Sequence, residues 1–325
     1  MKKQLWIAAA VAALLGGAPD GWADTMEGEH GPGGMGMWMD AGVESWSGDI
    51  TYRIGYPVTD AWGYRYDGYF PFSELEFPLD AEFGVVKGGI VVAEKYLLGI
   101  QVKKNLNDPD DDMEDRDWIT ESDPSRLDIY SNSTVSDFSA FVIDVDASYR
   151  FINNEQVRLA AGIGYMYQDF EYDTVVQRQW SPSGLEGFDY VGDGTVSLIY
   201  EVDCEIPYVL LSGQFNLLPN LKINGRFAFA PWVDVDDRDQ HLLRSKVNEG
   251  DMSGTAFMVS ADLQYDFTPQ LFATAGFNHT YIDVDGDMDA AFYGVYDHTV
   301  AEELESNQYA GYVTVGFRFG VPGQR

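Results

Sequence analysis

The sequence predicts an all-β protein, a ten-stranded antiparallel transmembrane β-barrel with long extracellular loops and short periplasmic turns. Three observations carry this prediction. Apolar and polar residues alternate strictly over many segments, short connections alternate with long ones, and no uncharged run of 18 residues follows the first 23 residues. Alternation with a period of two is typical of strands that have one apolar face, and a spanning helix needs about 20 apolar residues.

The alternation is clearest in three segments, residues 157–167, 255–267 and 313–319. In the second, Phe257, Val259 and Leu263 lie at odd positions, and polar residues occupy most even positions from 260 to 266. Two architectures fit such strands. In a soluble β-sandwich the apolar face packs on a second sheet, whereas in an outer-membrane barrel it faces lipid and the polar residues face the lumen.

Connection lengths favour the barrel. Membrane barrels need tight turns on the periplasmic side and longer loops outside. The sequence predicts short turns at 94–95, 153–154, 219–220 and 268–269, and long connections at 57–71, 107–127, 178–195, 233–245 and 284–304. Ten strands result. An even number is expected for a membrane barrel in which both chain termini lie on the same side of the membrane.

The two ends of the chain differ from the barrel in composition. Residues 1–23 read as a signal peptide, with Lys2 and Lys3 before a short apolar core. We expect a flexible segment at 24–43, the outer-membrane barrel at 44–319 and a C-terminal extension at 320–325. The single cysteine, Cys204, excludes an internal disulfide framework.

The net charge is strongly negative, with 53 acidic against 20 basic residues and a formal charge of −33. Such a chain repels nucleic acid, so we expect no nucleic-acid partner. Two interpretations of the acids stay open. They form a solvated surface, bridged to lipopolysaccharide phosphates by divalent cations, or they attract cationic peptides to the mouth of the barrel.

Two short acidic motifs lie where alternating segments give way to charged segments: Asp115-Arg116-Asp117-Trp118 and Asp239-Gln240-His241. An even number of strand steps separates them, so both lie at the same end of the predicted barrel. Opposed carboxylates and an imidazole can hold and polarise a water molecule, and only four histidines occur in the chain. Without further matches the same residues read as ordinary solvated loop charge.

Strand parity bears on the second motif. Lys222, Asn224 and Arg226 occupy even positions and are predicted to face the lumen. Continued alternation would then send Asp239 and His241 outward. A β-bulge near Pro231 or a change of course of the strand above the membrane would correct this, and bulges are frequent at barrel rims.

These residues resemble the omptin family, the outer-membrane endopeptidases built on ten-stranded barrels. Omptins carry an Asp-x-Asp-Trp motif after the third strand and an Asp-x-His motif after the seventh, and both are matched here. Flanking matches include Ile206-Pro207-Tyr208 and Arg244-Ser245-Lys246-Val247, and the resemblance covers most of residues 44–319. It implies a hydrolase in which Asp115, Asp117, Asp239 and His241 are catalytic, with His241 as general base on water and with no metal or other cofactor.

The chain departs from the family at the substrate pocket. Asp237 matches an acid that lines the pocket for a basic side chain, but Tyr52 stands where its usual Glu partner is expected, so both are candidate substrate-binding residues. Glu171 replaces a lipopolysaccharide-binding Arg, which puts dependence on lipopolysaccharide in doubt.

The predicted function is a cell-surface endopeptidase that acts on peptides or proteins and favours cationic substrates. The alternative is a catalytically silent barrel, either a small porin or a surface adhesin. The sequence predicts no oligomeric state.

Overall fold

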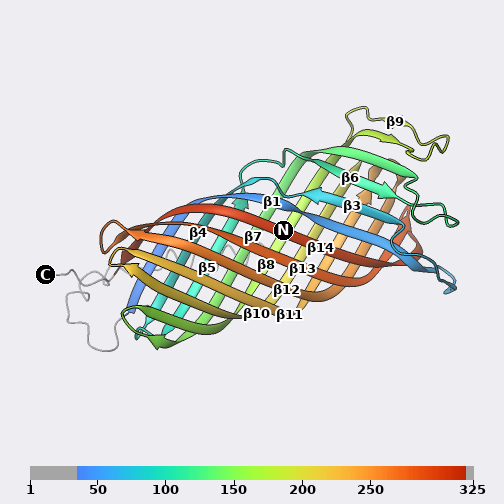
Figure 1. Cartoon of the computed structure of the whole chain (residues 1–325). Helices are drawn as coiled ribbons and strands as arrows, with labels where there is room; N and C mark the ends of the chain where they lie inside the picture. Colours follow the sequence, from blue (N-terminus) through green and yellow to red (C-terminus); the bar gives the residue numbers. More distant parts are fainter. Residues whose placement is uncertain (1–34, 320–325) are drawn as a thin grey trace.

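The computed structural model describes residues 35–319, and within them the chain forms strands joined by turns, loops and one short 3-10 helix (Figure 1). The elements are β1 (Met35–Asp60), β2 (Arg65–Tyr66), β3 (Ser73–Pro78), β4 (Glu82–Val92), β5 (Tyr96–Asn105), β6 (Asp112–Asp117), β7 (Ile129–Asn153), β8 (Val157–Trp180), β9 (Tyr190–Val191), β10 (Leu198–Leu218), β11 (Leu221–His241), η1 (Leu242–Arg244), β12 (Lys246–Asp266), β13 (Leu271–Phe292) and β14 (Val295–Phe319).

The strands close into one antiparallel ring, which confirms the predicted ten-stranded barrel. At the end with short turns, the turn end, the order is β1-β4-β5-β7-β8-β10-β11-β12-β13-β14 and back to β1. Toward the other end, the loop end, β3 and β6 replace β4 and β5 between β1 and β7. Two barrel strands are therefore interrupted, at residues 79–81 and 106–111. Closure leaves no unpaired edge, as a strand structure in a bilayer requires.

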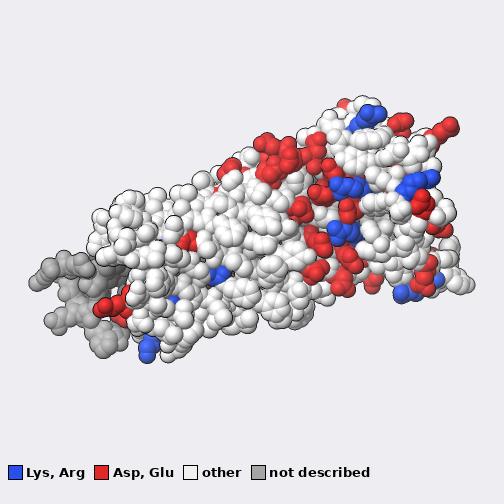
Figure 2. All heavy atoms as spheres, viewed as in Figure 1, with Lys and Arg blue, Asp and Glu red and all other residues white. Residues whose placement is uncertain are grey.

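The outer face of the half of the barrel nearer the turn end is apolar. Val43, Val209, Phe227, Leu263 and Val313 are each exposed to the extent of 50% or more of their surface. Figure 2 shows an uncharged band over this half of the molecule, with acidic and basic side chains gathered toward the loop end. This surface suits lipid, and the predicted transmembrane barrel is the fold observed. Among residues 35–319 no helix is long and apolar enough to cross a membrane.

The N-terminal boundary of the barrel lies earlier than predicted. β1 begins at Met35, and residues 37–43 pair with β14 and with β4, so residues 35–43 belong to the barrel and not to a flexible segment. The sequence there is rich in Gly and Met, which obscured the outward alternation of Met37 and Met39. The predicted signal peptide, residues 24–34 and the C-terminal extension at 320–325 lie outside the described residues.

The four predicted turns are confirmed, because they join β4 to β5, β7 to β8, β10 to β11 and β12 to β13. Among the predicted long connections, 107–127 contains the barrel strand β6, and two more are wrong over most of their length. Residues 233–241 continue β11, and residues 284–304 form the ends of β13 and β14 around a tight turn at Tyr293 and Gly294. Aspartates at alternate positions had suggested loops, but they lie on the outer face of strands: Asp283, Asp285, Asp287 and Asp289 are exposed, while Val284 and Met288 are buried.

The strands are longer than a bilayer requires. A tilted membrane strand needs about 10 residues, whereas β13 has 22 and β14 has 25. The surplus carries the barrel beyond the apolar band. There the outward positions of β11 to β14 are acidic, and this acidic exterior comprises Asp234, Asp236, Glu249, Asp251, Asp283, Asp285, Asp287, Asp289, Glu303 and Glu305.

A bulge in β11 reverses its parity, which is one of the two explanations that the sequence left open. The β11–β12 register shifts between Ala230 and Val233, so Pro231 and Trp232 interrupt the ladder. Before the bulge Ala228 and Ala230 are buried; after it Val233, Val235 and the odd positions that follow point inward. Pro231 has no N–H to donate, which suits a bulge position. The bulge turns Asp239 and His241 into the barrel.

Side chains fill the middle of the lumen. Gln168 of β8 and Gln308 of β14 lie on opposite sides of the ring, yet their amide groups are 2.9 Å and 2.8 Å apart in two hydrogen-bonding contacts. A cluster of aromatic rings also fills the lumen. In it Trp46 stacks on Phe83 at 4.3 Å between ring centroids, and Phe138 and Phe170 belong to the same cluster. An eight- to ten-stranded barrel is narrow enough for side chains to fill.

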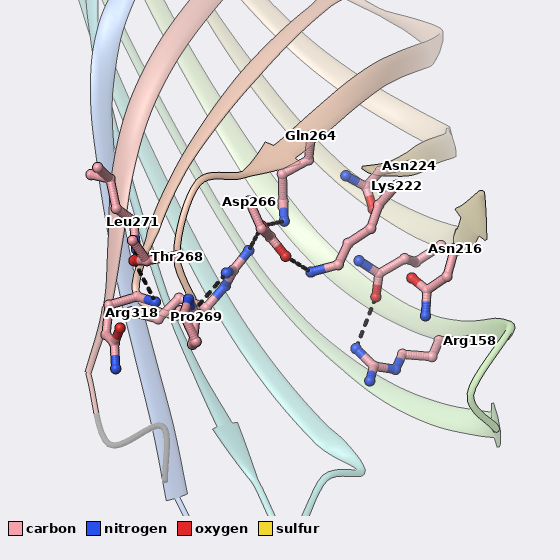
Figure 3. A network of polar contacts seen from close by, with 12 residues as sticks. Arg158, Asn216, Lys222, Asn224, Gln264, Asp266, Thr268, Pro269, Leu271 and Arg318 are labelled. Atoms are coloured by element: carbon pink, nitrogen blue, oxygen red, sulfur yellow. Dashed lines mark hydrogen bonds and ion pairs between the residues drawn. The ribbon is translucent and has the colours of Figure 1, made fainter. Parts of the chain in front are cut away.

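We call Gln168, Gln308 and this aromatic cluster the plug. Between the plug and the turn end, the lumen holds a polar cavity of about 650 Å³. Ion pairs brace its lower wall, where Asp266 accepts hydrogen bonds from Lys222 at 2.6 Å and from Arg318 at 2.7 Å. Figure 3 shows Asp266 between these two cations, close to the turn at Thr268 and Pro269. The lumen is thus polar at the turn end and closed by aromatic rings in the middle.

We predict that Phe83→Ala lowers the free energy of unfolding by about 3–5 kcal/mol, because it removes a buried ring and leaves a cavity beside Trp46. The measurement is urea unfolding of the refolded protein in detergent micelles. Phe277→Ala is the matched control, since Phe277 is 45% exposed on the outer face. An equal loss in both variants would contradict the assignment of the core to the lumen.

Candidate functional site

The four predicted catalytic residues lie inside the barrel at its loop end. Asp115 and Asp117 occupy alternate positions of β6, and Asp239 and His241 occupy the last inward positions of β11. The two motifs therefore lie on strands, and not in loops as the sequence suggested. Asp115 and His241 line one cavity of about 270 Å³. The structure brings the two motifs together across the mouth.

The intervening residue of the first motif anchors β6 from outside. Arg116 points away from the cavity, and its Nη1 lies 2.9 Å from both Glu74 and Glu76 of β3. In the ladder Ser73 faces Asp117 and Leu75 faces Asp115. These ion pairs on the outer face fix the position from which the two aspartates reach inward.

Asp239 is fully buried and receives three hydrogen bonds on Oδ2. The donors are Tyr52 Oη at 2.6 Å, His241 Nε2 at 3.0 Å and Asn248 Nδ2 at 3.2 Å. Burial alone would raise the pKa of Asp239, but His241, Tyr52 and the charge of Lys246 together lower it. Asp239 is therefore an anion, and it favours the tautomer of His241 that carries its proton on Nε2. Nδ1 then remains the basic nitrogen of the ring.

The opposite pair of carboxyl groups behaves differently. Burial and the charge of Asp117 raise the pKa of Asp115 well above its usual range, and burial raises the pKa of Asp117. Ser131 donates a hydrogen bond to Asp115 Oδ2 at 3.3 Å, while Oδ1 is shielded from solvent and has no partner among the described residues. Burial and the repulsion between the two carboxylates therefore favour the protonated form of Asp115.

Two cations complete the electrostatics of the site. Arg244 of η1 acts on both Asp115 and Asp117, and Lys246 at the start of β12 acts on these aspartates and on Asp239. Burial lowers the pKa of Lys246, although Asp239 opposes that change. The sequence placed both residues only in a flanking match. Their proximity follows from η1, which is only one turn long and returns the chain directly into β12.

Tyr52 and Asp237 were predicted to bind substrate. Tyr52 is buried in an aromatic stack, with ring centroids 5.2 Å from Tyr200 and 6.2 Å from Phe77. Its hydroxyl group donates to Asp239. Asp237 is 5% exposed and accepts hydrogen bonds from Tyr200 Oη at 2.9 Å and from Gly250 N at 3.1 Å. Substrate contact by these two residues stays a prediction; here both contact protein groups.

A second carboxyl pair lies beside Asp237. A Cβ atom on Gly250 would come within 2.1 Å of Glu302 and 2.5 Å of Asp237, so both carboxyl groups converge above this glycine. Burial raises the pKa of Asp237 to about 7, and burial together with Asp237 raises the pKa of Glu302 well above its usual range. The pair therefore carries at least one proton near neutral pH.

Sequence reasoning missed Asn248 and Glu302. Both occupy inward positions between buried apolar or small residues: Asn248 precedes Gly250 and Met252, and Glu302 lies between Val300 and Leu304. A single polar residue at the inward parity of a strand is the signal that would have found them. Among residues 35–319 no group of three or more His, Cys, Asp or Glu side chains is arranged to hold a metal ion.

Comparison with known proteins gives a family and a fold. The family model described as Omptin matches residues 66–321. The crystal structure of the outer membrane protease OmpT from Escherichia coli superposes with a TM-score of 0.74 at 16% identity, covering 91% of this chain and 100% of that one. The translocator domain of the autotransporter NalP from Neisseria meningitidis gives a TM-score of 0.38 at 10% identity, covering 96% and 97%. A search of curated protein sequences finds no match.

We predict that Asp237→Asn stabilises the protein at alkaline pH. The pKa of Asp237 is raised from 3.8 to about 7 on folding. The folded state then binds more protons than the unfolded state between these values, so stability falls as the pH rises through this range. Asparagine removes that loss, and at pH 8 we expect a gain on the order of 1–2 kcal/mol, with no gain at pH 4.

The measurement is urea unfolding in micelles at the two pH values. Asp234→Asn, on the exposed face of the same strand, is the control and should show no such pH-dependent gain. A gain of equal size at both pH values would show that Asp237 is not protonated by folding.

Proposed function

Because the chain belongs to the omptin family and forms an outer-membrane barrel, we propose that it is an endopeptidase that cleaves peptides at the cell surface by attack of an activated water molecule. The observation that carries this proposal is the cavity lined by Asp115 from β6 and by His241 from β11. His241, which is bound to the anionic Asp239, and Asp115, whose protonated form burial favours, thus face the same space, which is the arrangement that general acid–base hydrolysis requires.

His241 is the general base in this proposal. Its Nε2–H donates to the Asp239 carboxylate at 3.0 Å, which leaves Nδ1 to take a proton from water. The resulting hydroxide attacks the carbonyl carbon of the scissile bond. Asp239 stabilises the imidazolium that forms, and Tyr52 and Asn248 hold Asp239 in place. Tyr52 remains a donor because burial raises the pKa of its phenol well above its usual range.

In this proposal Asp115 stabilises the negative charge that develops on the substrate. A negative charge develops on the carbonyl oxygen during attack, and a protonated Asp115 can donate a hydrogen bond to it. Arg244 and Lys246 add positive charge beside it. The imidazolium of His241 then gives its proton to the leaving nitrogen as the C–N bond breaks. The immediate products are a carboxylic acid, which then loses its proton to solvent, and an amine, and no covalent acyl-enzyme forms.

Cationic peptides are the substrates that the exterior favours. The acidic exterior covers the outer face of β11 to β14 toward the loop end, and a field of one sign raises the local concentration of oppositely charged ligands. Dependence on lipopolysaccharide is a separate matter. Glu171 lies exposed on β8 opposite Glu201, so a lipopolysaccharide phosphate would be repelled there unless a divalent cation bridged it.

A catalytically silent barrel is the competing function. The plug of Gln168, Gln308 and aromatic rings speaks against a small porin, since solutes have no open path through the lumen at that level. An adhesin would need neither the Asp239–His241 bond nor the buried Asp115, both of which place ionisable groups in a site shielded from solvent. Such burial is unfavourable without a function that uses it.

We predict that His241→Ala lowers kcat/KM for peptide cleavage by about 100-fold or more, because the base is lost. The assay is cleavage of a mixed peptide library by refolded protein, with products identified by mass spectrometry. His298→Ala is the matched control, since His298 also pairs with an aspartate, Asp297, at 2.6 Å but lies away from the cavity. Undiminished cleavage by His241→Ala would refute the mechanism.

We also predict that Asp115→Asn keeps more activity than Asp115→Ala. If Asp115 acts as a protonated donor, the amide of asparagine replaces its hydrogen bond in part, whereas alanine removes it. We expect losses of about 10-fold for asparagine and about 100-fold or more for alanine in kcat. Equal losses, with both variants folded, would show that Asp115 acts as an anion and not as a donor.

A further inference from the structure

The cavity beside His241 has a wall of uncharged side chains. Its volume of about 270 Å³ exceeds the roughly 150 Å³ of a cavity that binds benzene in another protein, so it can hold one substrate side chain. Aliphatic and hydroxyl or amide groups line it together, among them Leu75, Met113, Val176, Thr174, Ser197 and Gln179. The ionisable groups in its lining, other than Tyr190, are Asp115, His241 and Arg244.

These ionisable groups disfavour a cation in the cavity. Arg244 is a permanent positive charge in the wall. Burial and Asp117 raise the pKa of Asp115, so this carboxyl group is neutral when its proton is in place. A Lys or Arg side chain entering the cavity would meet the fixed cation of Arg244 in its wall, and it would lose its hydration.

Two buried oxygen atoms of residues that line the cavity lack a hydrogen-bond partner among the described residues. Thr174 is fully buried, and its Oγ1 has no hydrogen-bond partner among the described residues. Asp115 Oδ1 is likewise shielded and unpartnered within residues 35–319. Both residues line the cavity. An unpaired buried polar atom is unfavourable, and a substrate hydroxyl, amide or backbone group would satisfy it.

The acid expected to bind a basic side chain is engaged elsewhere. Asp237 does not line this cavity; it accepts from Tyr200 and Gly250 and lies above Gly250 with Glu302. Tyr200 and Phe77 stack at 4.3 Å between ring centroids, and Tyr52 lies beside both, 5.2 Å from Tyr200 and 6.2 Å from Phe77. Aromatic rings therefore fill the space around Asp237, and a substrate side chain would have to displace them.

We propose that the cavity between β6, β8, β10 and η1 binds an uncharged substrate side chain next to the scissile bond, and that Asp237 contributes nothing to substrate selection. This inference rests on the proposed endopeptidase function and names its substrate class. Cationic residues elsewhere in the peptide still assist its approach to the acidic exterior. The protein thus combines a charged approach surface with a neutral subsite.

The test uses one peptide series with constant lysine-rich flanks. The residue on either side of a single cleavable bond is Leu, Gln, Lys or Glu, and kcat/KM is measured for each peptide with refolded wild-type protein. Dissociation constants are measured with His241→Ala, which keeps Thr174, Arg244 and Asp115. We expect Leu and Gln peptides to exceed Lys peptides by about tenfold or more in both kcat/KM and affinity.

Three variants locate the cause of the substrate preference. Arg244→Glu should raise the Lys-to-Leu ratio of kcat/KM by about tenfold, because it replaces the cation in the wall with an anion. Arg238→Glu is the matched control: Arg238 lies on the outer face of β11 between Glu201 and Glu249, and the ratio should not change. Asp237→Asn should also leave the ratio unchanged, whereas a tenfold fall would return substrate selection to Asp237.

Each outcome decides a different claim. Preference for Lys, or equal rates for Leu and Lys, overturns the neutral subsite while cleavage itself upholds the endopeptidase. If wild-type protein cleaves no peptide but His241→Ala binds Leu and Gln peptides more tightly than Lys peptides, hydrolysis is refuted and the neutral subsite stands. Equal affinities in that case overturn the subsite as well.

Discussion

The alternation of side chains between two sides of a closed ring is the constraint on which the rest of the structure depends. A bilayer requires every backbone polar group to be paired, so the strands must close and each residue must face either lipid or lumen. A single β-bulge can then exchange the two faces of a strand. The bulge at Pro231 and Trp232 does so in β11. Without it Asp239 and His241 would point outward, and no site would exist at the mouth.

Burial gives the two walls of the site opposite proton affinities. Asp239 accepts hydrogen bonds from Tyr52, His241 and Asn248, so it remains an anion although it is fully buried. Asp115 has one long hydrogen bond and an acidic neighbour, so burial raises its pKa and favours its protonated form. Tyr52 explains how the chain tolerates the loss of an acid expected at that position: its phenol stabilises the anion that another carboxylate would have repelled.

The sequence predicted the ring and the four turns, because these follow from period-two patterns and connection lengths, and strand parity showed that β11 needed a bulge or a change of course before Asp239 and His241 could face the lumen. It did not predict that residues 284–304 are strand, since aspartate is rare in strands and its outward placement on an extended barrel cannot be recognised from composition. Nor did it predict the bond between Tyr52 and Asp239, which joins residues 187 positions apart through side-chain reach across the lumen. Motifs can be recognised locally, whereas such a contact requires the closed ring.

The placement of acids on strands has a consequence of its own. Carboxylates on a loop can move apart when their neighbours ionise, but those at alternate positions of β11 to β14 are held at fixed spacing by the ladder. Their mutual repulsion can be relieved only by ions drawn from solution. The rim of the barrel therefore behaves as a rigid ion exchanger whose counter-ion layer thins as salt is added, and a polycationic molecule that replaces those small ions gains entropy from their release.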